Sequence, residues 1–485
     1  MASLPPSPDR LSALDAAFLD LETARAPLHV GWTLVFDGAP PSIAALRRHV
    51  DSRLAGIPRF RRRVVQPALG LGDAHWTDDV GFDVARHVHA LRLAPPAGDA
   101  ELRDLTGVLL AQPLDPARPL WRLQLVTGLP GGFAIVGQAH HALVDGLAAV
   151  EVATLLLSGG GESADARPGR AWSPQGAPAL AGSLASALSA RAGEAVRAGA
   201  ALSGGGPPGV VRSLARGAGG APQALSAIAA LASPTQATAL EQSITPARRV
   251  AFASAPLDPL RTAAARHGAT LNELLLAASA VAVGDALRRR GESHASIRAL
   301  VPANTRTQDE GGAEHGNRIT FLVLDLPVGE PDLARVLRLV RARSQARKRS
   351  GEAGAADALL RAADALPAAG RRRIARAAAR AARFSVIVSN VPGPDIELEL
   401  LGRPLRAAWP AVPLLDGHAL TIGALSYGGS LNVGVYADAK VVPDAALLAQ
   451  DLDRALRALT VLERPSATPW RARARVRRDA LRSTG

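Results

Sequence analysis

Apolar residues recur along this chain at two spacings, one typical of helices and the other of strands. Between Leu11 and Leu21 they fall at helical intervals, and Ser12 stands three residues before Asp15, as in a capping box. We therefore expect an amphipathic helix there. Apolar and polar residues alternate from Trp121 to Val126, and a Gly-Gly turn follows, so Phe133 to His140 is predicted to pair back on that strand.

The same reasoning predicts helices and strands in both halves of the chain. Helices are expected at Gly146 to Leu157, at Leu257 to His267 and from Leu271 onward. Strands are expected at His29 to Phe36, Arg249 to Ala253, Ile297 to Val301, Ile319 to Leu326, Phe384 to Val388, Leu420 to Tyr427 and Leu431 to Tyr436.

Composition divides the chain into two α/β domains. Residues 1–158 form the first domain and residues 244–463 the second. The segment 159–243 is rich in Ala, Gly, Ser and Pro, which is typical of a linker, and residues 464–485 form an Arg-rich tail without periodicity. Short helices within the linker are indicated by the spacing of Leu180, Leu184 and Leu188, and of Leu225, Ile228 and Leu231.

Length and composition favour a globular protein and exclude several kinds of chemistry. The 485 residues exceed the ~250 to 300 at which a single core stops growing, and 48% of them are hydrophobic. The chain contains no Cys, which excludes disulfides, thiolate zinc sites and a Cys nucleophile. The net charge of +13 comes almost entirely from Arg, and only 3% of residues are aromatic, so we expect no nucleic-acid partner.

Neither the N-terminus nor any internal run predicts export or membrane insertion. Asp9 and Arg10 follow three prolines where a signal peptide would be apolar. The longest apolar run, Leu274 to Val283, is shorter than the ~18 to 20 residues of a membrane span. We expect a cytoplasmic protein whose contact with the inner face of the membrane or with lipid inclusions is peripheral.

The segment HHALVDG, at the end of the predicted strand Phe133 to His140, is the strongest candidate for chemistry. Adjacent residues on a strand point to opposite faces, so one of His140 and His141 faces a cleft while the other packs behind. Imidazole accepts a proton near neutral pH, as activation of a hydroxyl requires. Asp145 is expected to hold the loop through hydrogen bonds, and Gly146 to allow a tight turn or close substrate approach.

Other features carry weaker signals. His87 and His89 alternate on an apparent strand, but no third ligand stands nearby, so we expect no metal site. The motifs of serine hydrolases, zinc proteases and P-loop NTPases do not occur in the sequence. Taken alone, Trp121 fits core packing equally well, Asn272 fits a helix cap, and Ser389 to Pro394 fits a rigid turn.

HHALVDG resembles the motif of the HHxxxDG acyltransferases, which include chloramphenicol acetyltransferase, peptide-synthetase condensation domains and the bacterial wax ester synthase/diacylglycerol acyltransferase family. The opening segment LSALDAAFLDLETARAPLHVG is similar to that of the last family, and the resemblance extends from about Leu11 to Leu459. The other matching motifs, in the family's order, are PLW (Pro119, Leu120, Trp121), Asn272 in ATLNELLLAA, VPANTR from Val301, GN (Gly316, Asn317), SNVPGP from Ser389 and LLDG from Leu414.

The resemblance implies a fold and a reaction. The expected fold is two chloramphenicol-acetyltransferase-like, condensation-domain-like α/β domains with a tunnel at their interface. The implied reaction transfers a fatty acyl group from acyl-CoA to diacylglycerol or a long-chain alcohol, with no cofactor and no covalent intermediate. His141 is implied as the general base, and Asn272 or a backbone N–H near the motif as the oxyanion donor. Substrate-binding roles are implied for Pro119, Leu120, Trp121, Ser389, Asn390, Pro392 and Gly393.

Two other functions remain open at this point. A catalytically silent lipid-binding or lipid-droplet protein of the same fold is disfavoured by the intact HHALVDG. A condensation-type, amide-forming enzyme is disfavoured because no carrier domain accompanies the chain. The preferred acceptor, the acyl length and the oligomeric state are left undecided by the sequence.

An Ala-rich helical stretch carries a cluster of arginines: Arg371, Arg372, Arg373, Arg376, Arg380 and Arg383. Four of them, from Arg373 onward, fall on one face. A solvated helix and a basic surface for anionic lipid head groups or the phosphates of coenzyme A are both consistent with this pattern.

Overall fold

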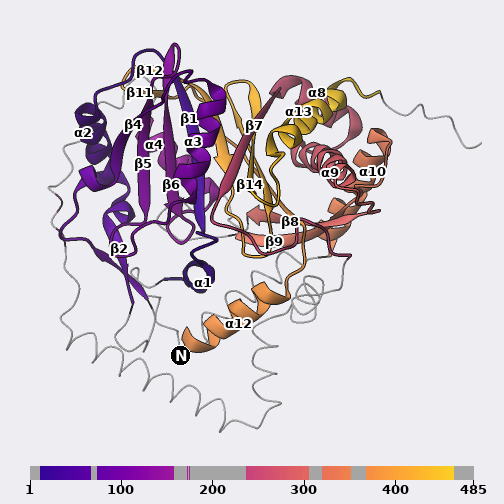
Figure 1. Ribbon diagram of the computed structural model, residues 1–485, viewed down its shortest axis with the longest axis horizontal. Helices are drawn as coiled ribbons and strands as arrows, with labels where there is room; N and C mark the ends of the chain where they lie inside the picture. The colour runs from indigo at the N-terminus through magenta and orange to yellow at the C-terminus, as the bar shows by residue number, and fades with distance from the viewer. Residues whose placement is uncertain are drawn as a thin grey trace, which may run out of the picture.

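The structure, a computed structural model, describes residues 11–66, 74–157, 172, 174, 236–304, 319–350 and 368–463. Two mixed β-sheets stand side by side, the first built mainly from the N-terminal half and the second from the C-terminal half (Figure 1). The predicted linker helices, the GN pair and the Arg-rich tail lie outside the described residues.

The first sheet has six strands, and helices cover both of its faces. α2 (Ile43–Arg53) and α4 (Gly146–Leu156) lie on one face, and α3 (Asp99–Ala111) contacts β1, β6 and the second sheet. In order, the strands are β11 (Glu399–Leu400), β12 (Arg403–Ala411), β1 (His29–Asp37), β6 (Gly132–His140), β5 (Trp121–Thr127) and β4 (Val88–Arg92). A separate hairpin-like pair joins β2 (Arg62–Val65) to β3 (His75–Asp78).

The second sheet also has six strands and carries a layer of four helices. Parallel pairing occurs where β10 joins β8 and β13, and the other pairs are antiparallel. The strand order is β7 (Arg248–Pro256), β14 (Ser430–Asp438), β13 (Leu420–Tyr427), β10 (Val386–Val391), β8 (Ile297–Asn304) and β9 (Ile319–Leu326). The helices are α8 (Leu257–His267), α9 (Leu271–Arg289), α10 (Leu333–Arg349) and α13 (Ala445–Val461).

The elements predicted from the two periodicities are confirmed, with ends that shift by a few residues. Ser12 caps α1 (Ala13–Leu21) by accepting a hydrogen bond from the backbone of Asp15 at 3.0 Å. The division at residue 244 stays a prediction, and the strands of the first sheet cross it. β11 and β12 come from the second half of the sequence but pair with β1, so the C-terminal half completes the first sheet.

The two halves share one apolar interior in addition to the first sheet, which β11 and β12 complete. One buried apolar cluster includes Val35, Leu110 and Val136 from the first half together with many residues of α9 and the second sheet. The hydroxyl of Tyr436 donates to the carbonyl oxygen of Leu110 at 3.2 Å, and burial raises the pKa of Tyr436 to about 12. The halves therefore pack as one body around their interface.

α1 packs against a basic surface helix, α12 (Ala368–Ala381). α12 extends along the lower edge of the molecule beside α1 (Figure 1). Arg372 pairs with Asp20 of α1 at 3.1 Å, and Arg376 donates to the Asp20 carbonyl oxygen at 3.3 Å. Burial raises the pKa of the Asp20 carboxyl despite the nearby Arg372 and Arg376.

Within the described ranges, no single helix is both long enough and apolar enough to cross a membrane. In the same ranges, α8 and α9 taken together, bent by 97° at their junction, have the length and composition of a span.

The contact between α3 and β7 gives a test of how closely the halves pack. A Cβ on Gly107 would lie 2.7 Å from the carbonyl oxygen of Arg248, a backbone atom held in the sheet. Gly107→Ala is therefore expected to cost about 1–3 kcal/mol of unfolding free energy, measured as a shift in the urea midpoint. The control is Gly370→Ala in α12, where a Cβ meets no atom within 4 Å and is expected to be neutral or stabilising by up to ~1 kcal/mol. A Gly107→Ala variant as stable as the wild type would contradict this packing.

Candidate active site

A cavity of about 310 Å³ lies between the two halves. One wall comes from α1, β1 and the beginning of α4, and the other from β10, β12, β13 and the segments beside them. Most of its lining is apolar, with side chains such as Leu28, Val30, Ile387 and Val412. A cavity of this size and character suits an apolar ligand oriented by a few polar groups.

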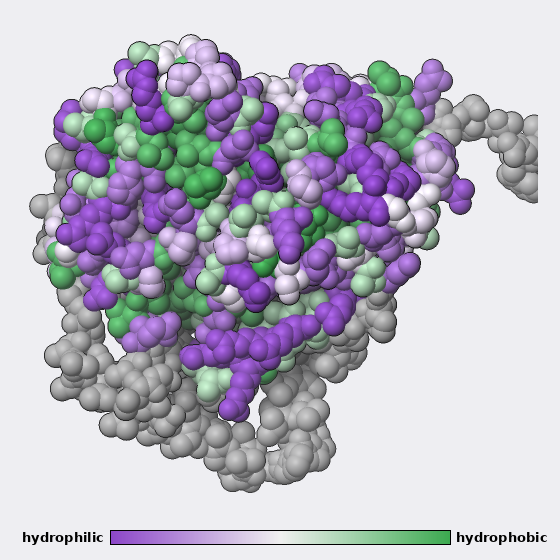
Figure 2. Space-filling model, in the orientation of Figure 1, coloured by the Kyte–Doolittle hydropathy of each residue, from purple (hydrophilic) through white to green (hydrophobic). Residues whose placement is uncertain are grey.

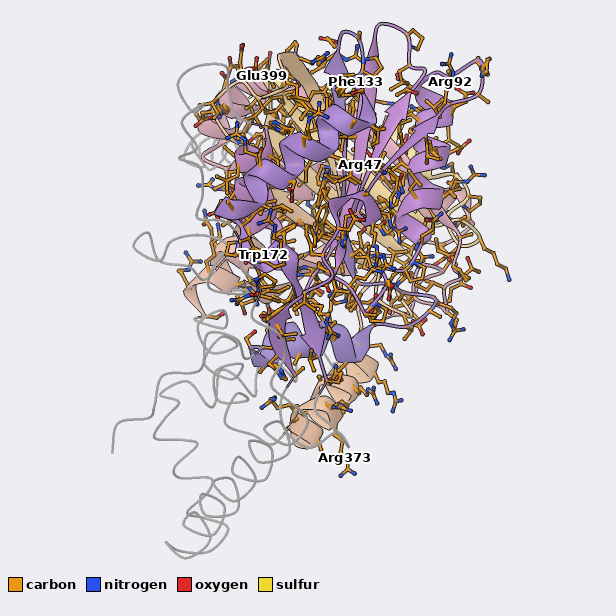
Figure 3. The ribbon with its side chains drawn as sticks, turned by 90° about the vertical axis from the view of Figure 1, so that its left-hand side faces the viewer. Arg47, Arg92, Phe133, Trp172, Arg373 and Glu399 are labelled. Atoms are coloured by element: carbon orange, nitrogen blue, oxygen red, sulfur yellow. The ribbon has the colours of Figure 1, made fainter. Side chains whose placement is uncertain are left out.

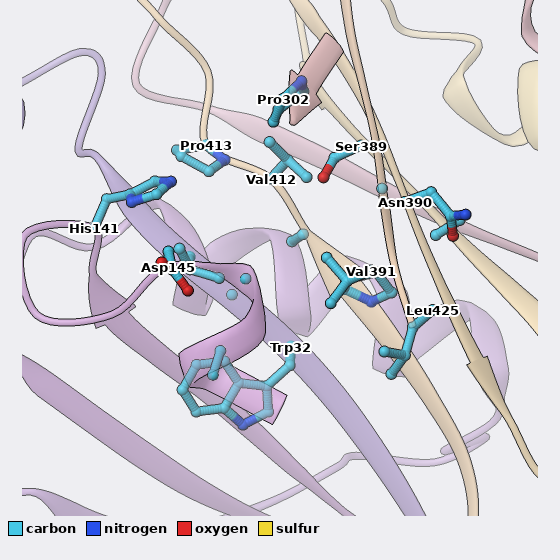
Figure 4. Close-up of a pocket in the computed structure, with 18 of the residues that line it drawn as sticks. Trp32, His141, Asp145, Pro302, Ser389, Asn390, Val391, Val412, Pro413 and Leu425 are labelled. Carbon is cyan, nitrogen blue, oxygen red and sulfur yellow. The ribbon is translucent and has the colours of Figure 1, made fainter. Parts of the chain in front are cut away.

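His141 is the histidine that faces this cavity. It follows β6 directly, its backbone N–H donates to the carbonyl oxygen of Leu28 at 2.8 Å, and its ring is half-buried. The ring of Phe18 from α1 stacks on the imidazole with centroids 4.0 Å apart. Figure 4 shows the imidazole of His141 directed toward the cavity. The stacking and the backbone bond together fix the ring's position.

His140 packs behind, as the alternation of side chains on a strand predicts. It is 1% exposed, and its Nδ1 accepts a hydrogen bond from the backbone of Ala142 at 3.0 Å. Its Nε2 lies 3.6 Å from one carboxylate oxygen of Glu22, and Nε2 of His29 lies 3.2 Å from the other. Glu22 also accepts from the backbone of Leu28, the residue that holds His141.

Burial and charge shift the pKa values of this cluster in a consistent way. Burial by itself would raise the pKa of Glu22, but its contacts with His140 and His29 outweigh that effect and hold the pKa below its ordinary range. Burial lowers the pKa of His29, although Glu22 opposes the shift. The cluster is thus a partly buried carboxylate, with a side chain 30% exposed, between two buried imidazoles, next to the loop that carries His141.

Asp145 and Gly146 form the junction between that loop and α4. The Asp145 side chain caps α4 by accepting a hydrogen bond from the backbone of Ala148 at 2.9 Å. A Cβ on Gly146 would lie 2.8 Å from a methyl group of Val391 in β10. The glycine is therefore required by the close approach of the second half, since its backbone conformation is one that any residue adopts.

The SNVPGP segment lies across the cavity from His141. Ser389, Asn390 and Pro392 line it, as Figure 4 shows for the first two. The Oδ1 atom of Asn390 is buried and has no hydrogen-bond partner among the described residues. Gly393 does not line the cavity. A Cβ there would lie 1.9 Å from the carbonyl oxygen of Ser426, so this glycine allows β13 to pass closely.

The structure does not bring the PLW residues to the cavity. Trp121 is buried in the first domain, where its indole stacks on His87 and donates to the carbonyl oxygen of Phe60 at 2.7 Å. Leu120 belongs to the same apolar cluster, and its carbonyl oxygen accepts from the backbone of His140 at 2.9 Å. Leu120 and Trp121 thus pack behind the histidine strand, Pro119 precedes them in the chain, and none of the three lines the cavity.

Asn272 is likewise absent from the cavity lining. It is the second residue of α9, and the helix is capped by Thr270, whose hydroxyl accepts from the backbone of Glu273. Glu273 completes the capping box by accepting from the backbone of Thr270 at 2.8 Å. The Asn272 amide, which was predicted as an oxyanion donor, therefore does not line the cavity. The residue that caps α9 is Thr270 and not Asn272.

Sequence reasoning missed three groups that the structure adds to the site. Phe18 was assigned only to a helix face, Glu22 and His29 were assigned no role, and Trp32 was read only as part of a strand. Glu22 and His29 lie in the segment LETARAPLHVG, which resembles the family's opening segment, and that resemblance was the one signal in the sequence that could have indicated them.

The described part of the chain contains no group of three His, Asp or Glu side chains placed to hold a metal ion. The ring of His87, one of the two histidines considered as metal ligands, forms a hydrogen bond with the carbonyl oxygen of Trp121 at 2.9 Å.

The fold is shared with two-domain acyltransferases and condensation domains of known structure. Similar solved structures include a condensation domain of the calcium-dependent antibiotic synthetase, with a TM-score of 0.56, 17% identity, and coverage of 94% of this chain and 96% of that one. The wax ester synthase/diacylglycerol acyltransferase from Marinobacter aquaeolei VT8 gives a TM-score of 0.64 at 22% identity, covering 93% of this chain and 98% of that one. These likenesses establish the fold expected from the sequence.

Family models and relatives identify the family. Residues 11–275 match the wax ester synthase/diacylglycerol acyltransferase catalytic domain, and residues 315–460 match the corresponding C-terminal domain. A putative diacylglycerol O-acyltransferase of Mycobacterium bovis and a probable one of Mycobacterium tuberculosis are each 30% identical over 94% of this chain and 96% of theirs. The chain belongs to the wax ester synthase/diacylglycerol acyltransferase family and is an O-acyltransferase.

The Glu22–His29–His140 cluster predicts how stability depends on pH. Because the pKa of folded His29 lies below its ordinary 6.5, the unfolded chain binds that proton at a higher pH, and stability falls as the pH drops beneath 6.5. The depressed pKa of Glu22 adds a further loss below its ordinary 4.5. In urea titrations from pH 7 to pH 5, His29→Gln is expected to show a shallower decline than the wild type. The control His89→Gln should follow the wild type, and equal slopes for all three proteins would refute the assignment.

Proposed function

We propose that this protein transfers a fatty acyl group from acyl-CoA to the hydroxyl of diacylglycerol or of a long-chain alcohol. The observation that carries the proposal is a half-buried imidazole, His141, at the wall of an apolar cavity between the two halves. Membership of the family and the names of the mycobacterial relatives support diacylglycerol as an acceptor. The apolar lining suits the hydrocarbon parts of both substrates.

His141 acts as the general base in this reaction. Its neutral imidazole takes the proton from the acceptor hydroxyl while the oxygen attacks the thioester carbonyl carbon. The tetrahedral intermediate then collapses, the carbon–sulfur bond breaks, and the imidazolium returns the proton to the departing CoA thiolate. The products are the ester and free CoA. No enzyme nucleophile is required, because the alcohol attacks the thioester directly, and no cofactor is needed for a thioester that is already activated.

The N-terminus of α4 is our candidate for binding the oxyanion, in place of Asn272. The first N–H groups of a helix have no acceptor within the helix and favour negative charge. Gly146 and Leu147, the first two residues of α4, both line the cavity beside His141. Asp145 holds this helix end by its bond to Ala148 and takes no part in proton transfer.

Replacement of His141 tests the proposed chemistry. His141→Ala and His141→Asn are expected to lower kcat by about 10² to 10⁴ with palmitoyl-CoA, because the general base is lost. Release of CoA and ester formation from diacylglycerol and from hexadecanol would be measured in parallel. The control is His89→Ala, which alters a histidine remote from the cavity lining.

The same assay decides between this function and a catalytically silent lipid-binding protein. If the wild type binds lipid but releases no CoA with any acceptor, the silent function is correct. Near-full turnover by His141→Ala would leave the enzyme class intact and overturn the role of His141.

We further propose that α12 attaches the protein to the inner face of the membrane or to lipid inclusions. Arg373 and Arg380 are exposed, and Ile374 between them is 54% exposed. Figure 3 shows Arg373 pointing away from the body of the protein, and Figure 2 shows a hydrophilic ridge where α12 lies. Exposed arginines beside an apolar residue suit an anionic lipid surface. α12 packs on α1, which carries Phe18 against His141, so a membrane bound there lies close to the cavity.

Removal of the outward charges tests this attachment. Arg373→Gln/Arg380→Gln is expected to weaken binding to vesicles that contain anionic lipid by roughly 30-fold, since each of the two basic residues near the surface contributes about 1 kcal/mol. Co-sedimentation with anionic and with purely zwitterionic vesicles would be compared. Arg335→Gln/Arg338→Gln on α10 removes the same charge elsewhere and serves as the control. Equal binding by both double variants would retire the proposal.

A further inference from the structure

A second, smaller cavity lies inside the first domain, next to the cavity that holds His141. It has a volume of about 30 Å³ and is enclosed by the first sheet, α2 and α4. Three residues line both cavities: Trp32 and Leu34 on β1, and Ala153 on α4. The two spaces are therefore neighbours that meet at these side chains.

α4 runs along both cavities. Five of its residues line the larger cavity, namely Gly146, Leu147, Ala149, Val150 and Ala153, so the cavity follows the helix for about 10 Å at 1.5 Å per residue. Val152, Ala153, Leu156 and Leu157 then line the smaller one. A chain that starts beside His141 and follows α4 therefore reaches the smaller cavity next.

The indole of Trp32 lies at the point where the two cavities meet. Trp32 pairs with Gly137 across β1 and β6, and a Cβ on Gly137 would lie 2.2 Å from the indole ring. The ring thus lies flat on the glycine, in the space between the sheet and α4. Figure 4 shows it on a different side of the start of α4 from His141.

We propose that Trp32 closes the smaller cavity and thereby sets the longest acyl chain that the protein accepts. This inference rests on the proposed function, with the thioester carbonyl beside His141 and the acyl chain directed along α4. The methyl end of the chain then meets the indole. With a smaller side chain at position 32, the chain extends between Leu34 and Ala153 into the second cavity.

The lining of the smaller cavity determines which part of a substrate it accepts. Leu46, Val50, Leu123 and Ile135 surround it, and the Nε2–H of His49 is already bonded to the carbonyl oxygen of Leu156 at 2.7 Å. It therefore offers no partner to the ester groups of a glyceride, and burying such groups unbonded is costly. An unbranched hydrocarbon end fits, and we assign it to the acyl donor.

The experiment compares the wild type with Trp32→Leu over saturated acyl-CoAs that differ by two carbons. Dissociation constants and kcat/KM are measured for each, with one fixed acceptor. In the wild type, the dissociation constant is expected to stop falling and kcat/KM to stop rising once the acyl chain reaches a limiting length. Trp32→Leu is expected to bind and use the next longer chain on the order of tenfold better than the wild type does, because two more methylenes become buried.

Two further variants separate an opened passage from general enlargement. Leu415 lines the larger cavity but not the smaller one. Leu415→Ala therefore enlarges the larger cavity alone, and the limiting chain length should stay where it is in the wild type. Ala153→Leu, added to Trp32→Leu, refills the passage and should restore the wild-type limit. Thermal unfolding midpoints establish that each variant is folded.

The inference is overturned if Trp32→Leu keeps the wild-type limit, or if Leu415→Ala extends the limit equally. It is also overturned if the limit moves only in a matching series of alcohols with one fixed acyl-CoA, because Trp32 would then bound the acceptor. A wild type that binds acyl-CoA without transferring the acyl group contradicts the proposed function, whereas the series of dissociation constants still tests the role of Trp32.

Discussion

The close approach of the two halves around His141 is the constraint on which the rest of this structure depends. β12 leaves the C-terminal half and pairs with β1, and Val391 of β10 approaches Gly146 so closely that a Cβ there would lie 2.8 Å from its methyl group. These contacts form an apolar cavity at the interface. The same interface determines which residues surround the imidazole, since β1, α1 and α4 contribute one wall and the second half the other.

Support for the imidazole comes from beneath it as well as from the cavity wall. The backbone bond to Leu28 and the ring of Phe18 position His141 directly, and Glu22 holds Leu28, His29 and His140 in one buried cluster. Because α1 carries both Phe18 and the pairing with α12, the basic surface helix and the reactive imidazole are linked through a single helix. In the attachment proposed for α12, the lipid surface therefore lies close to the cavity.

Periodicity was sufficient to predict most of the strands and helices that build the site, including α1, β6 and α4. It also predicted that one of the paired histidines faces a cleft, because that follows from local alternation alone. The exchange of β12 into the first sheet could not be predicted, since strand pairing over hundreds of residues leaves no local pattern. Trp121 and Asn272 illustrate the same limit. Their motifs match the family, but only tertiary packing shows that the indole serves the core and that Asn272 lies outside the cavity lining.

The proposed reaction requires that the acyl thioester meets His141 inside the cavity between the halves. A crystal structure with a non-reactive thioether analogue of acyl-CoA tests it most directly. The proposed reaction places the carbon that replaces the carbonyl beside the His141 ring and the hydrocarbon chain along α4 toward Trp32. Binding of the analogue with its chain outside this cavity, or with its thioether end far from His141, would rule out this site for acyl transfer.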